Sequence, residues 1–161
     1  MSDMPDSPHM SDAAVAVQKS FAGRANNRGW DLFENADRSA HEDREMLDAV
    51  HAACWHWSQV GDASQRAWAE LLVAAAHADL DSGPTAEAFA TVGWAVIAED
   101  DPDAWEVALG QAILAHAARA NGDMAVYAEA YERAQEAFEW VPEGANRTII
   151  ARTIARVPRP D

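Results

Sequence analysis

Short polar turns interrupt this chain at regular intervals, and between them apolar side chains return every three or four residues. The turn signals are Ser39, Gly61-Asp62, Asp81-Ser82-Gly83-Pro84, Asp101-Pro102, Asn121-Gly122-Asp123, and Pro142 with Gly144. This apolar repeat is typical of amphipathic helices, and turns this short connect antiparallel helices. The chain is therefore predicted to be all-α, with about seven helices stacked as antiparallel hairpins in a short α-α superhelix.

Individual residues predict where the helices begin and end. Ser39 with Glu42 forms a capping box, in which each side chain satisfies a free backbone N–H of the first turn. Helix starts are expected near positions 12, 40, 63, 84, 102, 124 and 147, with Asp62 and Gln65 starting the third helix. Asp101 is expected to cap the helix that starts at Pro102. Gly23 and the Asn26-Asn27 pair are potential breaks in the first helix.

Composition places these helices in a single domain over residues 12–161. Alanine fills 37 of the 161 positions, which favours helix throughout. Residues 1–11 carry no apolar run and no lysine or arginine, so we expect a disordered tail that is not a targeting signal. Cys54 is the only cysteine, which excludes an internal disulfide and cysteine-based zinc patterns. A cytoplasmic protein is the expectation.

Charge is unevenly distributed along the sequence. Residues 39–146 carry 20 acidic and 4 basic side chains, whereas residues 147–161 carry four arginines and one aspartate. An acidic body repels phosphates, so a nucleic-acid partner is not expected. The acidity is interpreted as a source of solubility or as attraction to a basic partner. A third hypothesis is that the acidic surface imitates nucleic acid and blocks a basic protein.

The segment 108–141 resembles one tetratricopeptide repeat, with Gly122-Asp123 on its central turn. The residues at its packing positions are Leu114, Ala115, Ala118, Tyr131 and Ala134. The segment departs from the repeat at Gln111, Tyr127 and Pro142. A weaker copy around Gly83 keeps Ala75, Ala76, Ala88 and Ala95. The resemblance implies the same stacked-hairpin architecture.

Residues 26–61 are similar to the start of an uncharacterised group of bacterial tetratricopeptide-like proteins. The similarity is carried by Asn27, Arg28, Trp30, Leu32, Asp37, Arg38, Glu45, Met46, Leu47, His51, His56, Trp57, Gln59, Val60 and Gly61. No activity is assigned to that group, so this resemblance implies a fold and no chemistry.

Histidines in the second predicted helix raise the question of a metal site. His51 and His56 lie about 140° apart around a helix, so these two cannot share a metal ion. His51 shares a face with Asp48 and Trp55, and Asp48 precedes it at the i, i+3 spacing of carboxylate and histidine metal ligands. Further ligands would have to come from His77, His116 or Glu70. A hydrogen-bonded Asp48 and His51 pair at the edge of the core is the simpler interpretation.

Three other features have a structural and a functional interpretation. Cys54 and Trp57 lie on an apolar stripe, which predicts packed core residues rather than a reactive thiol. Acidic residues 99–106 lack the spacing and the glycine of a calcium loop. Tyr127 and Tyr131 lie one turn apart and form either a core contact or an exposed ridge that binds a peptide.

The last predicted helix, over residues 147–157, is amphipathic and basic. Ile150, Ile154 and Val157 recur on one side, and arginines recur on another. We expect this helix to cap the stack by covering its last apolar face. A contact in a homo-oligomer and a contact with a partner are the alternatives. Three turns without an aromatic residue make a weak membrane anchor, so no membrane partner is expected.

These observations predict a non-enzymatic protein-interaction module that binds a protein or peptide. The more specific interpretation is that this partner is basic. No cofactor and no catalytic residue are predicted. The candidate contact residues are Asp48, His51, Trp55, His77, His116, Tyr127 and Tyr131. The alternative is a helical protein that binds a small molecule or a metal ion through Asp48, His51, His77 and His116.

Overall fold

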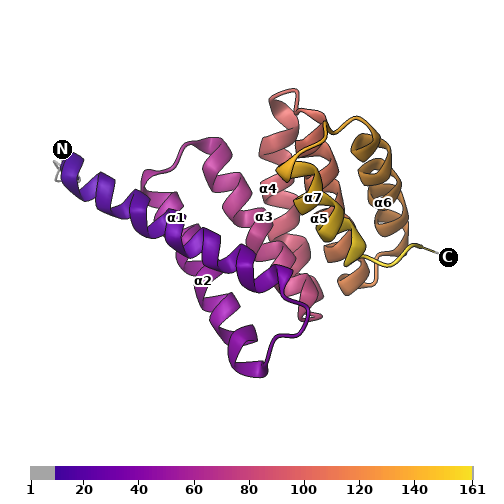
Figure 1. Ribbon diagram of the computed structural model, residues 1–161, viewed down its shortest axis with the longest axis horizontal. Helices are drawn as coiled ribbons and strands as arrows, with labels where there is room; N and C mark the ends of the chain where they lie inside the picture. Colours follow the sequence, from indigo (N-terminus) through magenta and orange to yellow (C-terminus); the bar gives the residue numbers. More distant parts are fainter. Residues whose placement is uncertain (1–9, 161) are drawn as a thin grey trace, which may run out of the picture.

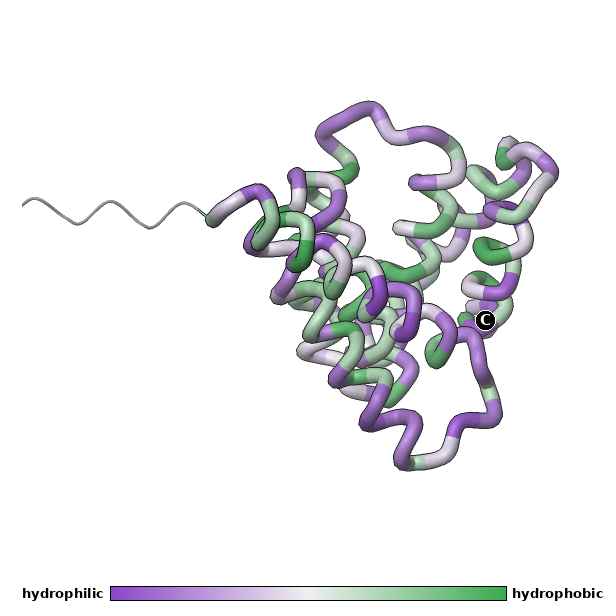
Figure 2. Tube along the Cα trace, turned by 60° about the vertical axis from the view of Figure 1, so that its left-hand side comes forward, coloured by the Kyte–Doolittle hydropathy of each residue, from purple (hydrophilic) through white to green (hydrophobic). Residues whose placement is uncertain are grey.

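A computed structural model describes residues 10–160 of the chain. These residues form seven α-helices and no strand, as predicted (Figure 1). The helices are α1 (Asp12–Glu34), α2 (Ala40–Val60), α3 (Ala63–Asp79), α4 (Gly83–Glu99), α5 (Ala104–Asn121), α6 (Met124–Glu139) and α7 (Ala145–Ala155). Hydrophilic residues gather at the connections between helices (Figure 2).

Consecutive helices pack as the predicted hairpins. The most extensive contacts join α1 to α2, α3 to α4, and α5 to α6. Helix α3 also contacts α1, α2 and α5, so it lies at the centre of the stack. Helix α7 lies against α5 and α6 (Figure 1). The prediction of an all-α stack of helical hairpins is confirmed.

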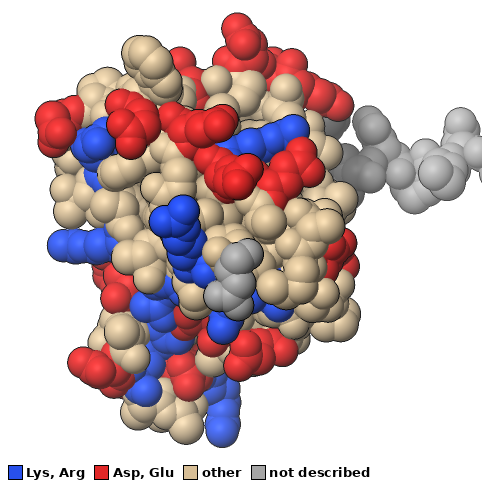
Figure 3. Space-filling model, turned by 90° about the vertical axis from the view of Figure 1, so that its right-hand side faces the viewer, with Lys and Arg blue, Asp and Glu red and all other residues tan. Residues whose placement is uncertain are grey.

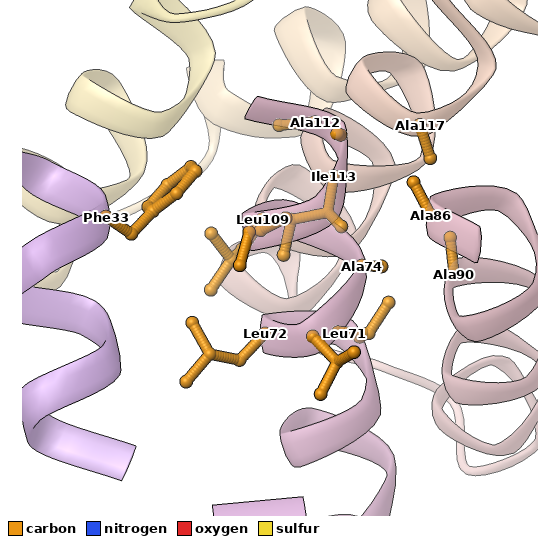
Figure 4. Packing of buried hydrophobic residues seen from close by; sticks show 14 of the residues in the cluster. Phe33, Leu71, Leu72, Ala74, Ala86, Ala90, Leu109, Ala112, Ile113 and Ala117 are labelled. Atoms are coloured by element: carbon orange, nitrogen blue, oxygen red, sulfur yellow. The ribbon is translucent and has the colours of Figure 1, made fainter. Parts of the chain in front are cut away.

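Small side chains, many of them alanine, allow other helices to pack closely around α3. Residues 71–76, which begin with Leu71 and Leu72, are all buried. Figure 4 shows Phe33 of α1 entering this core from one side and Ala86 and Ala90 of α4 facing it from the other. Gly93 permits the close approach of α4, because a Cβ there would lie 2.8 Å from the carbonyl oxygen of Ala67. Small side chains thus bring several helices within direct packing distance.

Helix ends agree with the predicted signals at some positions and differ at others. The Ser39–Glu42 and Asp62–Gln65 capping boxes both form. The fifth helix does not start at Pro102 with Asp101 as its cap. It starts at Ala104 with Asp103 as N-cap, whose backbone N–H donates to Glu106 at 3.0 Å. Asp101 instead adopts a positive φ of 51° in the connection.

Helix α1 is continuous, so the potential break at Gly23 and Asn26-Asn27 is wrong. A Cβ at Gly23 would meet nothing within 4 Å, so this glycine leaves no packing defect. Packing of α1 along α2 supplies the stability that the local sequence lacks. Of the tail expected over residues 1–11, positions 1–9 lie outside the described residues, and Ser11 is the N-cap of α1.

Within residues 10–160, no helix combines the length and the apolar character that crossing a membrane requires.

Candidate functional site

Two of the predicted contact histidines meet. Nε2 of His51 on α2 lies 2.9 Å from Nε2 of His77 on α3, and the edge of Phe89 on α4 completes the contact with ring centroids 5.9 Å apart. A hydrogen bond between two imidazole nitrogens needs one of them unprotonated. Burial, and then the charge of His51, lowers the pKa of His77. The pair is therefore suited to holding α2 against α3 at neutral pH.

The other predicted residues do not join this pair into a metal site. Within residues 10–160, no group of three or more histidine, cysteine, aspartate or glutamate side chains is arranged to hold a metal ion. Asp48 is exposed, and Trp55 is 64% exposed. His116 is buried on α5, where its ring lies 6.5 Å from the ring of Phe33. The set of Asp48, His51, His77 and His116 is thus not assembled in one place.

The two tyrosines form a packed contact rather than an open ridge. Tyr127 is 3% exposed, and its hydroxyl donates a hydrogen bond to the carbonyl oxygen of Pro158. Its ring meets Tyr131 edge to face, with centroids 6.4 Å apart. The C-terminal segment therefore covers the ring that the peptide-binding interpretation would need exposed. Cys54 is half-buried against the core, and burial followed by the charge of Glu70 raises its pKa.

A largely buried charged cluster joins α3 to the C-terminal end of α7 and to the loop after α1. Both oxygens of Asp79 accept hydrogen bonds from Arg156, each at 2.6 Å, and one also accepts from Arg38. Arg38 further donates to the carbonyl oxygens of Leu32 and Asn35, each at 2.8 Å. Burial acts to raise the pKa of Asp79, but the bonds from the two arginines outweigh it and hold the pKa below its usual value.

Helix α7 spans Ala145–Ala155, two residues earlier at each end than predicted, and its arginines are engaged inside the fold. Ile150 and Ile154 are buried, Arg152 binds Glu34 at 3.0 Å, and Arg156 lies 4.8 Å from the ring centre of Phe33. Carboxylates of α1 and α3 therefore neutralise two arginines of the basic segment, Arg152 and Arg156. Figure 3 shows acidic and basic side chains intermingled on the face that carries α6 and the C-terminal end.

A groove of about 700 Å³ opens between α1, α3, α5 and α7. Its aromatic wall consists of three tryptophans, Trp30, Trp68 and Trp105. Its polar lining is Asn26, Asn27, Asp31, Glu34, Asn146 and Arg152, and its aliphatic lining is Leu109, Ile149 and Ile150. This volume lies within the range of pockets that bind small molecules or a few residues of a peptide.

The hairpin topology explains why two of the tryptophans meet. Helices α3 and α5 are separated by one antiparallel helix, so they run in the same direction and start at the same end of the stack. Trp68 and Trp105 both lie near those starts, and their rings stack with centroids 5.3 Å apart and planes 19° apart. Trp30 of α1 meets Phe33 edge to face at 5.8 Å. The three indoles are partly exposed and rigidly supported.

The charge of the groove favours a cation. Asp31 and Glu34 lie on the groove side of α1. Among the described residues, Arg152 is the one basic residue in the groove lining, and it is already bound to Glu34. The nearby positive ends of α3 and α5 do not attract an anion, because Asp62 and Asp103 with Glu106 cap them. Arg28, one turn before Asp31, is held by Glu45 of α2 at 2.7 Å. The carboxylate of Asp31 therefore faces the groove with no ion pair inside the described chain.

Sequence reasoning assigned none of Trp30, Trp68 and Trp105 to a binding site. The available signal was the unusual number of tryptophans, seven in 161 residues. Two of them stand near the starts of helices that lie two apart in the hairpin order. That position brings side chains to one end of a stack whenever the helices alternate in direction.

Comparisons with known proteins give this groove no precedent. No family model matches the chain, and neither the curated proteins nor the solved structures contain a match. The resemblance to tetratricopeptide repeats therefore stays a prediction.

Proposed function

We propose that this protein is a non-enzymatic interaction module that binds a segment of a partner protein in the groove between α1, α3, α5 and α7. The observation that carries the proposal is the wall formed by Trp30, Trp68 and Trp105 beside the carboxylate of Asp31. Tryptophan is enriched among the residues that contribute most to protein interfaces. Its indole gives a large apolar contact with little loss of conformational entropy.

The order and the chemistry of the groove lining both support this function. Stacked Trp68 and Trp105 are already ordered by each other, so binding would not have to immobilise them. Asn26, Asn27 and Asn146 supply amide groups that can pair with the backbone of an extended peptide. Apolar walls with a few polar groups are typical of recognition sites. The expected partner segment is basic, since the lining and the whole chain are acidic.

The proposal is tested by panning a displayed library of short random peptides against the purified protein. The enriched peptides are then measured against the wild type, Trp68→Ala, Trp105→Ala and a matched control, Trp140→Ala. Trp140 is 80% exposed and lies outside the groove, so its loss changes tryptophan content without changing the site. Circular dichroism and thermal unfolding show which variants keep the fold.

We expect peptides rich in arginine or lysine to be enriched. Their affinity should fall by about tenfold or more in the folded groove variants and stay unchanged in Trp140→Ala. The proposal is wrong if no peptide is enriched, or if the enriched peptides bind folded groove variants as tightly as the wild type. Should Trp68→Ala or Trp105→Ala unfold the chain, Trp68→Phe and Trp105→Phe keep an aromatic ring and replace them in the comparison.

A further inference from the structure

We infer that the groove recognises an arginine side chain of the partner, with its guanidinium lying against the indole wall and paired with Asp31. This inference rests on the proposed function and goes further, because it names the side chain that the groove selects.

Arginine in this chain is repeatedly held between an aromatic ring and oxygen acceptors. Arg156 lies 4.8 Å from the ring centre of Phe33 while it binds both oxygens of Asp79. The guanidinium of Arg147 lies 4.1 Å from the ring centre of Phe138 and donates at 2.7 Å to the carbonyl oxygen of that same residue. A guanidinium on a ring with oxygens at its edge is thus an arrangement that this fold uses twice among the described residues.

The groove offers the same groups without a guanidinium between them. Trp68 and Trp105 cover one face of each other, so at most one face of each of these indoles is left for a cation, and Trp30 adds a third indole to the lining. Tryptophan is the strongest partner in cation–π contacts. Asp31 provides a carboxylate at the rim. The amide oxygens of Asn26 and Asn27, one helical turn before Trp30 and Asp31, can accept the remaining N–H groups.

These groups distinguish arginine from lysine. A guanidinium is planar, carries five N–H donors and stacks on an aromatic face, and it is more weakly hydrated than an ammonium group. It can contact an indole with its face while its edge bonds to a carboxylate and to amide oxygens. A lysine ammonium is a compact, strongly hydrated charge that would gain the attraction of Asp31 without the stacking. The groove should therefore prefer arginine even though both side chains carry the same charge.

The test uses three matched fluorescent peptides derived from one enriched peptide of the panning experiment. They carry arginine, lysine or citrulline at the same position; citrulline has the shape of arginine without its charge. Fluorescence anisotropy gives the dissociation constant of each peptide for the wild type, Asp31→Asn and a control, Glu139→Gln, which removes one negative charge from exposed α6.

We expect the arginine peptide to bind about tenfold more tightly than the citrulline peptide and about threefold more tightly than the lysine peptide. Asp31→Asn should reduce the preference over citrulline, whereas Glu139→Gln should preserve it. Equal affinity for arginine and lysine would overturn the inference and leave the groove as a site for any cation. Equal affinity for the citrulline and arginine peptides would show that the groove does not recognise a cation. The panned peptides would still show that the groove binds a peptide. If every peptide bound folded Trp68→Ala and Trp105→Ala as tightly as the wild type, the proposed function would be overturned instead.

Discussion

Two regions of this molecule contain the same three kinds of group, an arginine, a carboxylate and an aromatic ring, in different environments. In the cluster around Asp79, Arg156 contacts both the carboxylate of Asp79 and the ring of Phe33 inside the fold. In the groove, the three indoles and Asp31 face an open space, and Arg152 reaches only Glu34 at the rim. The first arrangement holds the helices together, and the second leaves part of its binding capacity for another molecule.

Burial separates the two regions in energetic terms. The side chains of Arg38, Asp79 and Arg156 are 5%, 12% and 17% exposed, whereas those of Arg152 and Glu34 are 62% and 24% exposed. Removing one member of a buried ion pair leaves a charge without water or partner, which is costly. Removing one member of an exposed pair leaves a charge that water can solvate.

The largest expected effect follows from Asp79→Asn. The change leaves Arg156 charged and largely buried beside a neutral amide, whereas Arg38 keeps its ion pair with Asp43 at 2.9 Å, so we expect the free energy of unfolding to fall by about 3 kcal/mol. Urea unfolding monitored by circular dichroism measures this loss. The matched change at the groove rim, Glu34→Gln, should cost about 0 to 1 kcal/mol. Similar losses of unfolding free energy in Asp79→Asn and Glu34→Gln would contradict the distinction between the buried cluster around Asp79 and the exposed groove rim.

The pH dependence of stability gives a second, smaller effect, which arises from His116 beside the buried cluster around Asp79. Burial lowers the pKa of His116 from 6.5 to about 4. The unfolded chain therefore takes up a proton as the pH falls through about 6.5, while the folded chain takes it up only near pH 4. Stability that is present at neutral pH is thus lost on acidification, by about 2 kcal/mol between about pH 7 and about pH 5.

His116→Gln is the variant that isolates this contribution. Its free energy of unfolding should change less between the two pH values than that of the wild type, by about 2 kcal/mol. The shift of His77, which acts in the same direction, remains in both proteins and cancels in the difference. The measurement is a pair of urea titrations for each protein. Parallel pH profiles of the two proteins would show that His116 is not held neutral in the folded state.

Helix ends could be predicted from the sequence to a greater extent than the groove. Helix ends depend on local signals, so Ser39 with Glu42 and Asp62 with Gln65 were predicted correctly. Asp103 with Glu106 carries the same signal, but Asp101-Pro102 two residues earlier was a competing start, and the local pattern does not rank the two. The continuity of α1 past Gly23 depends on packing against α2, which the sequence of α1 does not contain.

The candidate site depends on contacts between helices that are distant in the chain. Spacing within one helix identified His51 and Asp48, but the partner of His51 is His77 on the next helix, and Asp48 takes no part in that contact. The groove needs α1, α3, α5 and α7 together, so no single periodic pattern reveals it. Tyr127 was recognised as aromatic and adjacent to Tyr131, yet its burial depends on where the segment around Pro158 lies.

The smallest expected effect sharpens the distinction at the groove itself. Arg152→Gln removes the guanidinium that now binds Glu34, so that two carboxylates, Asp31 and Glu34, become free for a basic peptide. We expect the panned arginine peptide to bind about threefold more tightly to this variant at low salt, which corresponds to roughly 0.7 kcal/mol. Fluorescence anisotropy in low salt and in about 0.5 M salt measures the gain, which should shrink as screening increases.

Arg133→Gln is the matched control, because it removes one positive charge from an exposed pair with Glu129 on α6, outside the groove. If the gain came only from the more negative total charge, Arg133→Gln would produce the same increase in affinity as Arg152→Gln. Weaker binding to Arg152→Gln would instead mean that Arg152 contacts the peptide directly. In that case the rim pair would belong to the binding surface rather than compete with the ligand for it. Tighter binding confined to Arg152→Gln would show that the groove binds a guanidinium of the partner in place of the one that Arg152 of α7 now supplies to Glu34.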